Sequence, residues 1–410
     1  MTAQTSALPI EDPAVLDETP STPTSWSGVF AMSICAFALV ASEFMPVSLL
    51  TPIAGDLNVT EGMAGQGIAI SGAFALLTSL FISALAGALD RKTLLLALTA
   101  AMGLSGAIVA LAPDYFTYML GRALIGVVIG GFWSMSAATA IRLVPIAQVP
   151  RALAIFNGGN ALATVVAAPL GAYLGAVVGW RGAFLCLVPV ALVTLVWQWL
   201  TLPTMRSEKR AAGAGHVFKA FRLLARPGVA VGMAAGGLFF MGQFALFTYV
   251  RPFLETVTGV RVPTLSLILL AIGIAGLLGT LLIGRMLRRG FYPTLIAISL
   301  LMAAIALGLI AFGGWIAVVV PLLALWGLSG TAAPVGWWAW VARSFPHDAE
   351  AGGGLFVAVV QLAIGLGSTV GGLLFDHGGY QHTFVASAGL LLVSAGLTLR
   401  VARTGPAQST

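Results

Sequence analysis

Long apolar runs separated by short polar joints dominate this sequence. A membrane helix needs about 20 mostly apolar residues, and twelve such runs can be laid along the chain. They cover residues 28–54, 62–88, 93–112, 116–141, 152–178, 182–201, 228–250, 264–285, 292–313, 315–341, 352–374 and 383–401. Several joints are only a few residues long, so consecutive helices must be antiparallel neighbours. The pattern predicts an all-α membrane protein with twelve transmembrane helices.

The composition supports a bilayer as the solvent. Hydrophobic residues make up 59% of the 410 residues and charged residues only 8%, whereas a soluble domain has about 25% charged residues. A water-soluble chain this apolar would expose large apolar patches and aggregate. The 50 glycines suit helices that pack closely through small side chains.

The distribution of cationic residues predicts the orientation, because Lys and Arg stay preferentially in cytoplasmic loops. With the N-terminus inside, only Arg181, Arg251 and Arg261 of the 20 Lys and Arg residues fall outside, and Arg122 lies within a helix. This asymmetry predicts an N-in/C-in topology. The basic residues lie between apolar runs rather than along one stripe, so the net charge of +6 does not indicate a nucleic-acid partner.

The same pattern divides the chain into segments. Residues 1–25 are polar, carry only acidic charges and lack the basic start and apolar core of a secretory signal, so we expect a disordered cytoplasmic tail. We then expect a six-helix bundle over 26–201, a basic cytoplasmic linker over 202–227 and a second bundle over 228–403. Residues 404–410 would form a short cytoplasmic tail.

An internal repeat relates the two halves at an offset of about 200 residues. The positions that coincide are Pro52 with Pro252, Gly171 with Gly371, and the turn Gly179-Trp180-Arg181 with Gly379-Tyr380-Gln381. Parallel six-helix repeats predict two pseudo-symmetric bundles around an axis along the membrane normal. Substrate would then bind near the midplane between the bundles, and rocking would alternate its access to the two sides.

Glu43 is the strongest candidate for proton coupling, because it is the acidic residue deep in an apolar run. Ionisable groups inside a membrane are costly and therefore informative. Such a carboxyl can bind a proton when it faces one side and release it when its surroundings change. The alternative is a structural Glu that is permanently paired.

Arg122 is the cation deep in a helix, and we expect it to take part in coupling with Glu43. At 1.5 Å per residue the depths of the two residues differ by about 6 Å, within reach of two long side chains. The alternatives are an arginine that extends toward the membrane surface or one that bonds to helix carbonyls.

Neutral polar and aromatic residues are the candidates for substrate binding. Gln243 matches Glu43 at the offset of 200, and its amide can bind a ligand but cannot titrate. The further amides are Asn157, Asn160 and Gln361, and the candidates for stacking on a flat ligand are Trp133, Phe247, Tyr249 and Trp337. An unpaired amide in hydrocarbon is costly, whereas any one aromatic side chain can equally serve lipid contact or helix packing.

Two further features predict conformational gating. Asp90 and Arg91 belong to a charged turn that can cap a helix and bond to its neighbour in one conformation only. Pro169 would bend the fifth helix. The chain has no phosphate-binding loop, no zinc spacing and no nucleophile with a nearby His, so we expect a transporter rather than an enzyme. We expect no cofactor or metal, with protons as the coupling ion, and we interpret Cys35 and Cys186 as buried small hydrophobes.

Several motifs resemble the major facilitator superfamily, in its twelve-helix drug/proton antiporter group. Residues 86–92 are similar to the signature loop after helix two, Leu120-Gly121-Arg122 with Gly126 resembles the helix-four signature, and Ala168-Pro169 with Gly171 resembles the antiporter signature of helix five. Ser42–Pro52 is similar to the first-helix block of bacterial sugar-efflux and nucleoside-efflux proteins. The segments that resemble bacterial purine ribonucleoside efflux pumps more particularly are Gly131–Ala137, Arg142–Pro145, Gly242–Phe244, Thr248–Pro252 and Pro334–Trp337.

The resemblance implies a proton-coupled antiporter that exports purine ribonucleosides such as inosine, adenosine or guanosine by alternating access. A sugar or multidrug exporter of the same fold is the alternative. We expect a monomer embedded in the lipid bilayer of a bacterial inner membrane. Its partner would be a small, nucleoside-like substrate.

Overall fold

The computed structural model describes residues 25–86, 89–145, 148–205, 224–225, 227–345 and 349–404, and the described chain contains helices but no strands. The first group of helices comprises α1 (Trp26–Asp56), α2 (Glu61–Ala86), α3 (Arg91–Ala110), α4 (Tyr115–Arg142), α5 (Val149–Val177), α6 (Gly179–Leu185) and α7 (Leu187–Thr201). The second comprises α9 (Pro227–Phe247), α10 (Val250–Thr256), α11 (Val262–Arg289), α12 (Phe291–Phe312), α13 (Ile316–Ser344) and α14 (Ala349–Thr404). The predicted tails and most of the predicted linker lie outside the described residues.

Within the described chain, 11 helical stretches are long and apolar enough to cross a membrane. The prediction of an all-α membrane protein is therefore confirmed. The joint expected between residues 374 and 383 is shorter than predicted, because helical residues continue on both sides as far as Gly379. The backbone leaves helical geometry at Gly379, with φ 70° and ψ −174°, so two helices meet there at a single-residue hinge.

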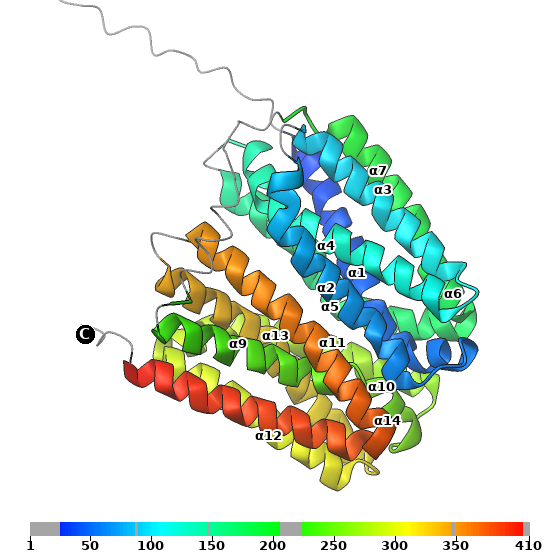
Figure 1. Ribbon diagram of the computed structural model, residues 1–410, viewed down its shortest axis with the longest axis vertical. Coiled ribbons are helices and arrows are strands. Elements are labelled where there is room, and N and C mark those ends of the chain that lie inside the picture. The colour runs from blue at the N-terminus through cyan, green and yellow to red at the C-terminus, as the bar shows by residue number, and fades with distance from the viewer. Residues whose placement is uncertain are drawn as a thin grey trace, which may run out of the picture.

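The helices form two groups that lie side by side (Figure 1). In the first group α1 packs along α5, and α4 packs along both α2 and α3. In the second group α14 packs along α9 and α12, and α11 packs along α13. The groups meet where α2 lies against α14 and where α5 lies against α11. Any site between the groups must therefore be lined by helices from both halves of the sequence.

The turn predicted to repeat has a glycine with positive φ in both halves. Gly179 has φ 75° and Gly379 has φ 70°, a conformation that glycine adopts readily because it has no Cβ. The two glycines are 200 residues apart. Each follows the end of a long helix and lets the chain reverse its direction. A side chain at either position would strain the turn.

Candidate transport site

Two prolines inside α1 leave backbone carbonyls that need a hydrogen-bond donor from a neighbouring helix. Proline has no backbone N–H, so the carbonyl four residues before it loses its helical donor. In hydrocarbon there is no water to replace that donor, so a neighbouring group must supply one. Pro46 and Pro52 lie inside α1, and the carbonyls that they leave free belong to Ser42 and Ser48.

Arg122 of α4 supplies the donor that Pro46 removes. Its side chain is fully buried, and its Nη1 donates to the Ser42 carbonyl at 2.9 Å. Its Nε donates to the Gly67 carbonyl at 3.0 Å and its Nη2 to the Ser71 hydroxyl at 3.3 Å, both on α2. Of the alternatives left open by the sequence, the geometry matches the arginine that bonds helix carbonyls. Arg122 thereby ties α4 to α1 and α2.

Glu43 follows Ser42 on α1 and is half-buried. It makes no hydrogen bond or ion pair with any residue that the structure describes, although the charge of Arg122 acts on it electrostatically. The guanidinium is held by carbonyl and hydroxyl oxygens instead. The carboxyl group is therefore not locked in a permanent pair, and it lies near a fixed positive charge. That arrangement suits a group that binds and releases a proton.

Gln243 of α9 occupies the equivalent position in the second half. Its Nε2 donates to the Gly330 carbonyl of α13 at 3.3 Å, and this carbonyl is also left free by a proline, because Pro334 lies four residues later. Its Oε1 is buried and has no hydrogen-bond partner among the described residues. An unsatisfied buried acceptor costs about 1–3 kcal/mol, so this oxygen is suited to receive a donor from a ligand.

An aromatic pair joins the two halves beside these polar residues. Phe44 of α1 and Phe244 of α9 have ring centroids 6.2 Å apart with an interplanar angle of 34°. Phe247 lies edge-on to Phe244 at 6.3 Å. Sequence reasoning found Phe247 but missed the other two rings. The repeat carried the missing signal, since the offset of 200 places Phe44 on Phe244.

Two of the predicted stacking residues lie elsewhere. Trp133 is packed against Phe156 at 5.9 Å within the first half. Trp337 is buried in the second half, where it packs against Phe239 and Trp340. The structure brings neither of them to the aromatic pair between the halves.

Tyr249 connects the turn after α9 to the α2–α14 contact. The side chain is fully buried, stacks on Phe375 at 5.3 Å and donates to the Ser368 carbonyl at 2.8 Å. A Cβ at Gly65 or at Gly372 would collide with its hydroxyl. The ring therefore fills the space where the two halves approach each other, and it has no free face for a ligand in this arrangement.

The remaining predicted amides differ in their surroundings. Asn157 is exposed and donates to the Leu153 carbonyl of its own helix at 2.9 Å. Asn160 is half-buried, and its side chain has no hydrogen bond within the described chain. Gln361 of α14 is buried, and its backbone carbonyl faces Gly72 of α2. Asn160 and Gln361 thus retain free polar groups, whereas Asn157 satisfies its own donor.

The predicted gating residues occupy helix ends and contacts. Asp90 caps α3 by accepting from the Lys92 amide at 2.7 Å, and the Arg91 amide donates to the Met205 carbonyl at 3.1 Å. Pro169 is buried in α5 and frees the carbonyl of Val165.

A glycine of the other half approaches the carbonyl that Pro169 frees. The Val165 carbonyl oxygen would lie 2.6 Å from a Cβ added at Gly273 of α11. Real Cβ contacts are not that short, so only glycine fits there without a shift. Pro169 therefore lies next to the α5–α11 contact between the halves.

Hydrogen bonds between the halves lie near the end of the molecule where α1 ends and α2 begins. Asp376 of α14 accepts from the Thr60 hydroxyl at 2.6 Å and from the Gly62 amide at 3.0 Å. Thr369 donates to the Gln66 side-chain carbonyl at 2.9 Å. These contacts close the α2–α14 seam at this end.

Arg251 of α10 closes the adjacent seam against α1. Its Nη1 donates to the Ser48 carbonyl, which is the second carbonyl that a proline frees in α1. Its Nε donates to Glu255 at 2.8 Å, and its Nη2 lies at the same distance from that carboxylate. The sequence placed Arg251 among the outer loop cations, but the residue is only 6% exposed. It is therefore a buried link between the halves.

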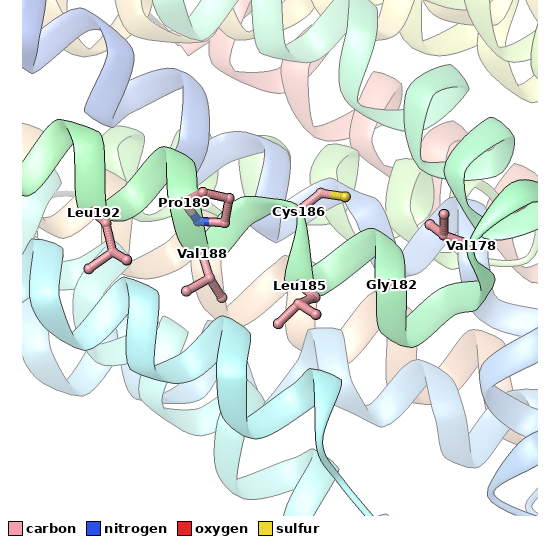
Figure 2. A pocket seen from close by; sticks show the side chains of 7 residues that line it. All are labelled: Val178, Gly182, Leu185, Cys186, Val188, Pro189 and Leu192. Carbon is pink, nitrogen blue, oxygen red and sulfur yellow. The ribbon is translucent and has the colours of Figure 1, made fainter.

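A shallow groove on α6 and α7 offers no comparable chemistry. Figure 2 shows its lining side chains, which include Cys186, Pro189 and Leu192. The expectation that Cys186 is buried is wrong: this residue lies where α6 and α7 join, on the outer surface of the first half, and its side chain is exposed. The groove is almost wholly apolar and faces away from the site between the halves, so it fits hydrocarbon rather than a polar substrate.

Comparisons with known proteins indicate the family of this chain. The family model described as Major Facilitator Superfamily matches residues 32–367. A protein named purine ribonucleoside efflux pump NepI, from Salmonella paratyphi C, is 39% identical over 371 residues, covering 90% of this chain and 92% of the relative. A protein named transcription regulatory protein OpdE, from Pseudomonas aeruginosa, is 74% identical over 388 residues, covering 95% and 96%.

Solved structures share the fold at low sequence identity. The crystal structure of a mutant of the nucleoside transporter NupG has a TM-score of 0.75 at 14% identity and covers 91% of this chain and 98% of its own. A bacterial homologue of the human lysosomal transporter Spinster, in an inward-facing and unoccupied conformation, has a TM-score of 0.74 at 15% identity and covers 94% and 98%. At these identities the likeness concerns the fold alone.

Proposed function

This chain belongs to the Major Facilitator Superfamily, and from that premise we propose that it exports purine ribonucleosides across a bacterial inner membrane in exchange for protons. The family and the long apolar helices make it a multi-pass membrane transporter. The observation that supports the substrate and proton assignments is the arrangement where the halves meet. A carboxyl that bonds to no residue the structure describes and an amide with an unsatisfied acceptor flank an aromatic pair contributed by both halves.

The aromatic pair and the amide fit the chemistry of a purine nucleoside. Phe44 and Phe247 are half-buried, so part of each ring is accessible for stacking on a flat base. The open Oε1 of Gln243 can accept from an N–H on the base edge or from a ribose hydroxyl. Asn160 and Gln361 offer further neutral groups. A relative at 39% identity that is named as a purine ribonucleoside efflux pump supports the same substrate class.

Proton exchange is assigned to Glu43, with Arg122 as the fixed charge beside it. A loaded proton would neutralise the carboxyl and change its interaction with the guanidinium, which biases the balance between the two access states. Asp90, Arg91 and Pro169 are proposed to take part in that change of access, since they lie at helix ends or next to a contact between the halves.

Transport in inverted membrane vesicles tests this proposal. With an imposed pH gradient, radiolabelled inosine should accumulate, and a protonophore should abolish the accumulation. Ethidium and a free sugar are the comparison substrates. Vesicles that accumulate ethidium or the sugar but not inosine would overturn the nucleoside assignment in favour of the multidrug or sugar exporter.

The proposed topology has twelve membrane helices, with α14 counted as two on either side of Gly379, and both termini in the cytoplasm. A reporter fused after residue 210 should then be active in the cytoplasm, and one inserted near Asp114 should report the periplasm. A periplasmic position for residue 210 would reverse the orientation. We propose that the transporter acts as a monomer, which the mass of the purified protein in detergent would test.

The relative named as a transcription regulatory protein points to a second candidate, an effect on gene expression. An exporter alters transcription when its substrate is also an inducer, because export lowers the cytoplasmic concentration of that substrate. The variant Glu43→Gln separates the two possibilities. If regulation follows from transport, this variant should lose both activities; if it keeps regulation without transport, the chain signals by another route.

A further inference from the structure

The buried arginine of α10 performs a task that the proposed transport site does not explain. Arg251 lies seven residues beyond Phe244, bonds to its own half through Glu255 and bonds to the other half through the Ser48 carbonyl. The Ser48 carbonyl needs an external donor because Pro52 removes its helical one. The link therefore joins the Ser48 carbonyl, which needs a hydrogen-bond donor, to the Arg251 side chain, which Glu255 holds in position.

We propose that Arg251 and the carbonyl freed by Pro52 form a latch that closes the substrate path at the end of the membrane where α1 ends, with Glu255 as the positioning residue. The proposal rests on alternating access, as in the proposed function, but not on the identity of the substrate. Opening this end separates α1 from α10. The hydrogen bond between the Ser48 carbonyl and the guanidinium then breaks. The bond between Arg251 and Glu255 persists, because both residues belong to one helix.

Glu255 keeps the guanidinium ready for closure. It lies one helical turn after Arg251, and one carboxylate oxygen accepts from the arginine. Its second oxygen, Oε2, is buried and has no partner in the part of the chain that the structure describes. The side chain therefore commits its interaction to Arg251 rather than sharing it with another donor, which aims the guanidinium at α1.

Pro52 gives this latch a specific chemical test. Pro52→Ala restores a backbone N–H that can satisfy the Ser48 carbonyl in both the open and the closed arrangement. The carbonyl then no longer depends on Arg251. Arg251→Met removes the donor of the same hydrogen bond. The effects of the two substitutions on opening should therefore not be independent.

Opening is measured without any substrate by labelling a buried reporter. Val47→Cys, introduced after both native cysteines are replaced with Ala, places a thiol at a position that is 1% exposed and packed against the core of the second half. A membrane-impermeant maleimide reaches it only when this end opens. Because a charge-assisted hydrogen bond is lost, Arg251→Met should raise the labelling rate by about tenfold. Glu255→Gln should raise it by a smaller factor.

The double variant decides the mechanism. Pro52→Ala should raise labelling on its own but add little in the Arg251→Met background. Pro321→Ala is the matched control: it removes an exposed helix proline of α13, and any effect that it has should multiply with that of Arg251→Met. Unchanged labelling in Arg251→Met, or independent effects of Arg251→Met and Pro52→Ala, would overturn the latch.

Two controls keep these outcomes interpretable. Each variant is first checked for a sharp thermal unfolding transition in detergent, and Arg251→Lys, which keeps the charge but not the fork of donors, replaces Arg251→Met if the latter does not fold. Arg251→Lys should raise labelling by a smaller factor, and unchanged labelling in this variant would also overturn the latch. If inosine transport fails in the parent protein while labelling responds as expected, the substrate assignment is wrong and the latch stands.

Discussion

Equivalent positions in the two halves of this protein hold different chemistry in similar surroundings. Glu43 and Gln243 each precede a phenylalanine of the pair that joins the halves. Near Glu43, Arg122 satisfies the Ser42 carbonyl that Pro46 frees, and the carboxyl makes no bond to any described residue. In the second half, Gln243 itself satisfies the carbonyl that a proline frees. The first half thus keeps its titratable group available, whereas the second half uses the equivalent side chain partly for structure.

A backbone carbonyl that lacks its helical donor thus has different consequences in the two halves. In the first half an arginine from a neighbouring helix donates to this carbonyl, so Glu43 remains available for proton exchange. In the second half Gln243 itself donates to the carbonyl through its amide N–H, so only its side-chain oxygen remains for a ligand. Single substitutions can alter one half without changing the other.

The largest effect is expected when the two halves are made chemically alike. Glu43→Gln should reduce uphill, pH-driven transport to background, because an amide cannot carry a proton in the working range. Exchange of labelled for unlabelled substrate at equal pH should persist. Both are measured in inverted vesicles. Glu43→Asp, which keeps the carboxyl, is the control, and full uphill transport by Glu43→Gln would remove this residue from the coupling.

Loss of the arginine should affect stability as well as transport. Arg122→Met leaves the Ser42 carbonyl without a donor, a loss of about 1–3 kcal/mol, and it removes the tie between α4 and its neighbours. We expect a lower thermal unfolding midpoint in detergent and at least about tenfold less transport.

Pro46→Ala provides an internal check on that result, since it returns a backbone donor to Ser42. Combined with Arg122→Met, it should recover part of the lost stability but not the transport, because the fixed charge beside Glu43 is still missing. Recovery of both would mean that Arg122 serves structure alone.

A smaller effect is expected from the second half. Gln243→Ala removes the open acceptor and should raise KM for inosine several-fold, as expected for one hydrogen bond to a neutral group worth about 1 kcal/mol. Its dependence on the pH gradient should remain, because Glu43 is intact. An unchanged KM would show that the free oxygen does not contact the substrate.

The smallest effect is expected at the exposed end of the α2–α14 seam. Asp376→Asn keeps only one of the two oxygens that accept from the Thr60 hydroxyl and the Gly62 amide, but exposed interactions of this kind contribute about 0–1 kcal/mol. Transport and the thermal unfolding midpoint should stay close to those of the parent protein. An increase in the labelling of Val47→Cys as large as that expected for Arg251→Met would mean that this contact, rather than the α1–α10 link, holds the end closed.

The sequence alone determined the class of this protein and much of its plan. Apolar runs of the right length predict membrane helices whatever their neighbours, because a helix satisfies its backbone internally and hydrocarbon imposes a minimum length. The offset of 200 predicted matching turns at Gly179 and Gly379, since a reversal there needs the φ that glycine adopts readily. Glu43 and Arg122 stood out because ionisable groups are rare in apolar runs.

Only the tertiary structure decided which side chains meet. The freed carbonyls of Ser42 and Ser48 follow from the positions of the prolines in the sequence, but their donors, Arg122 and Arg251, come from helices that are distant along the chain. Likewise Trp337 and Phe244 both read as aromatic residues of a membrane helix, yet one packs inside its own bundle and the other meets Phe44 across the halves. Periodicity defines the face of a helix, whereas the neighbour of that face is set by how all the helices pack together.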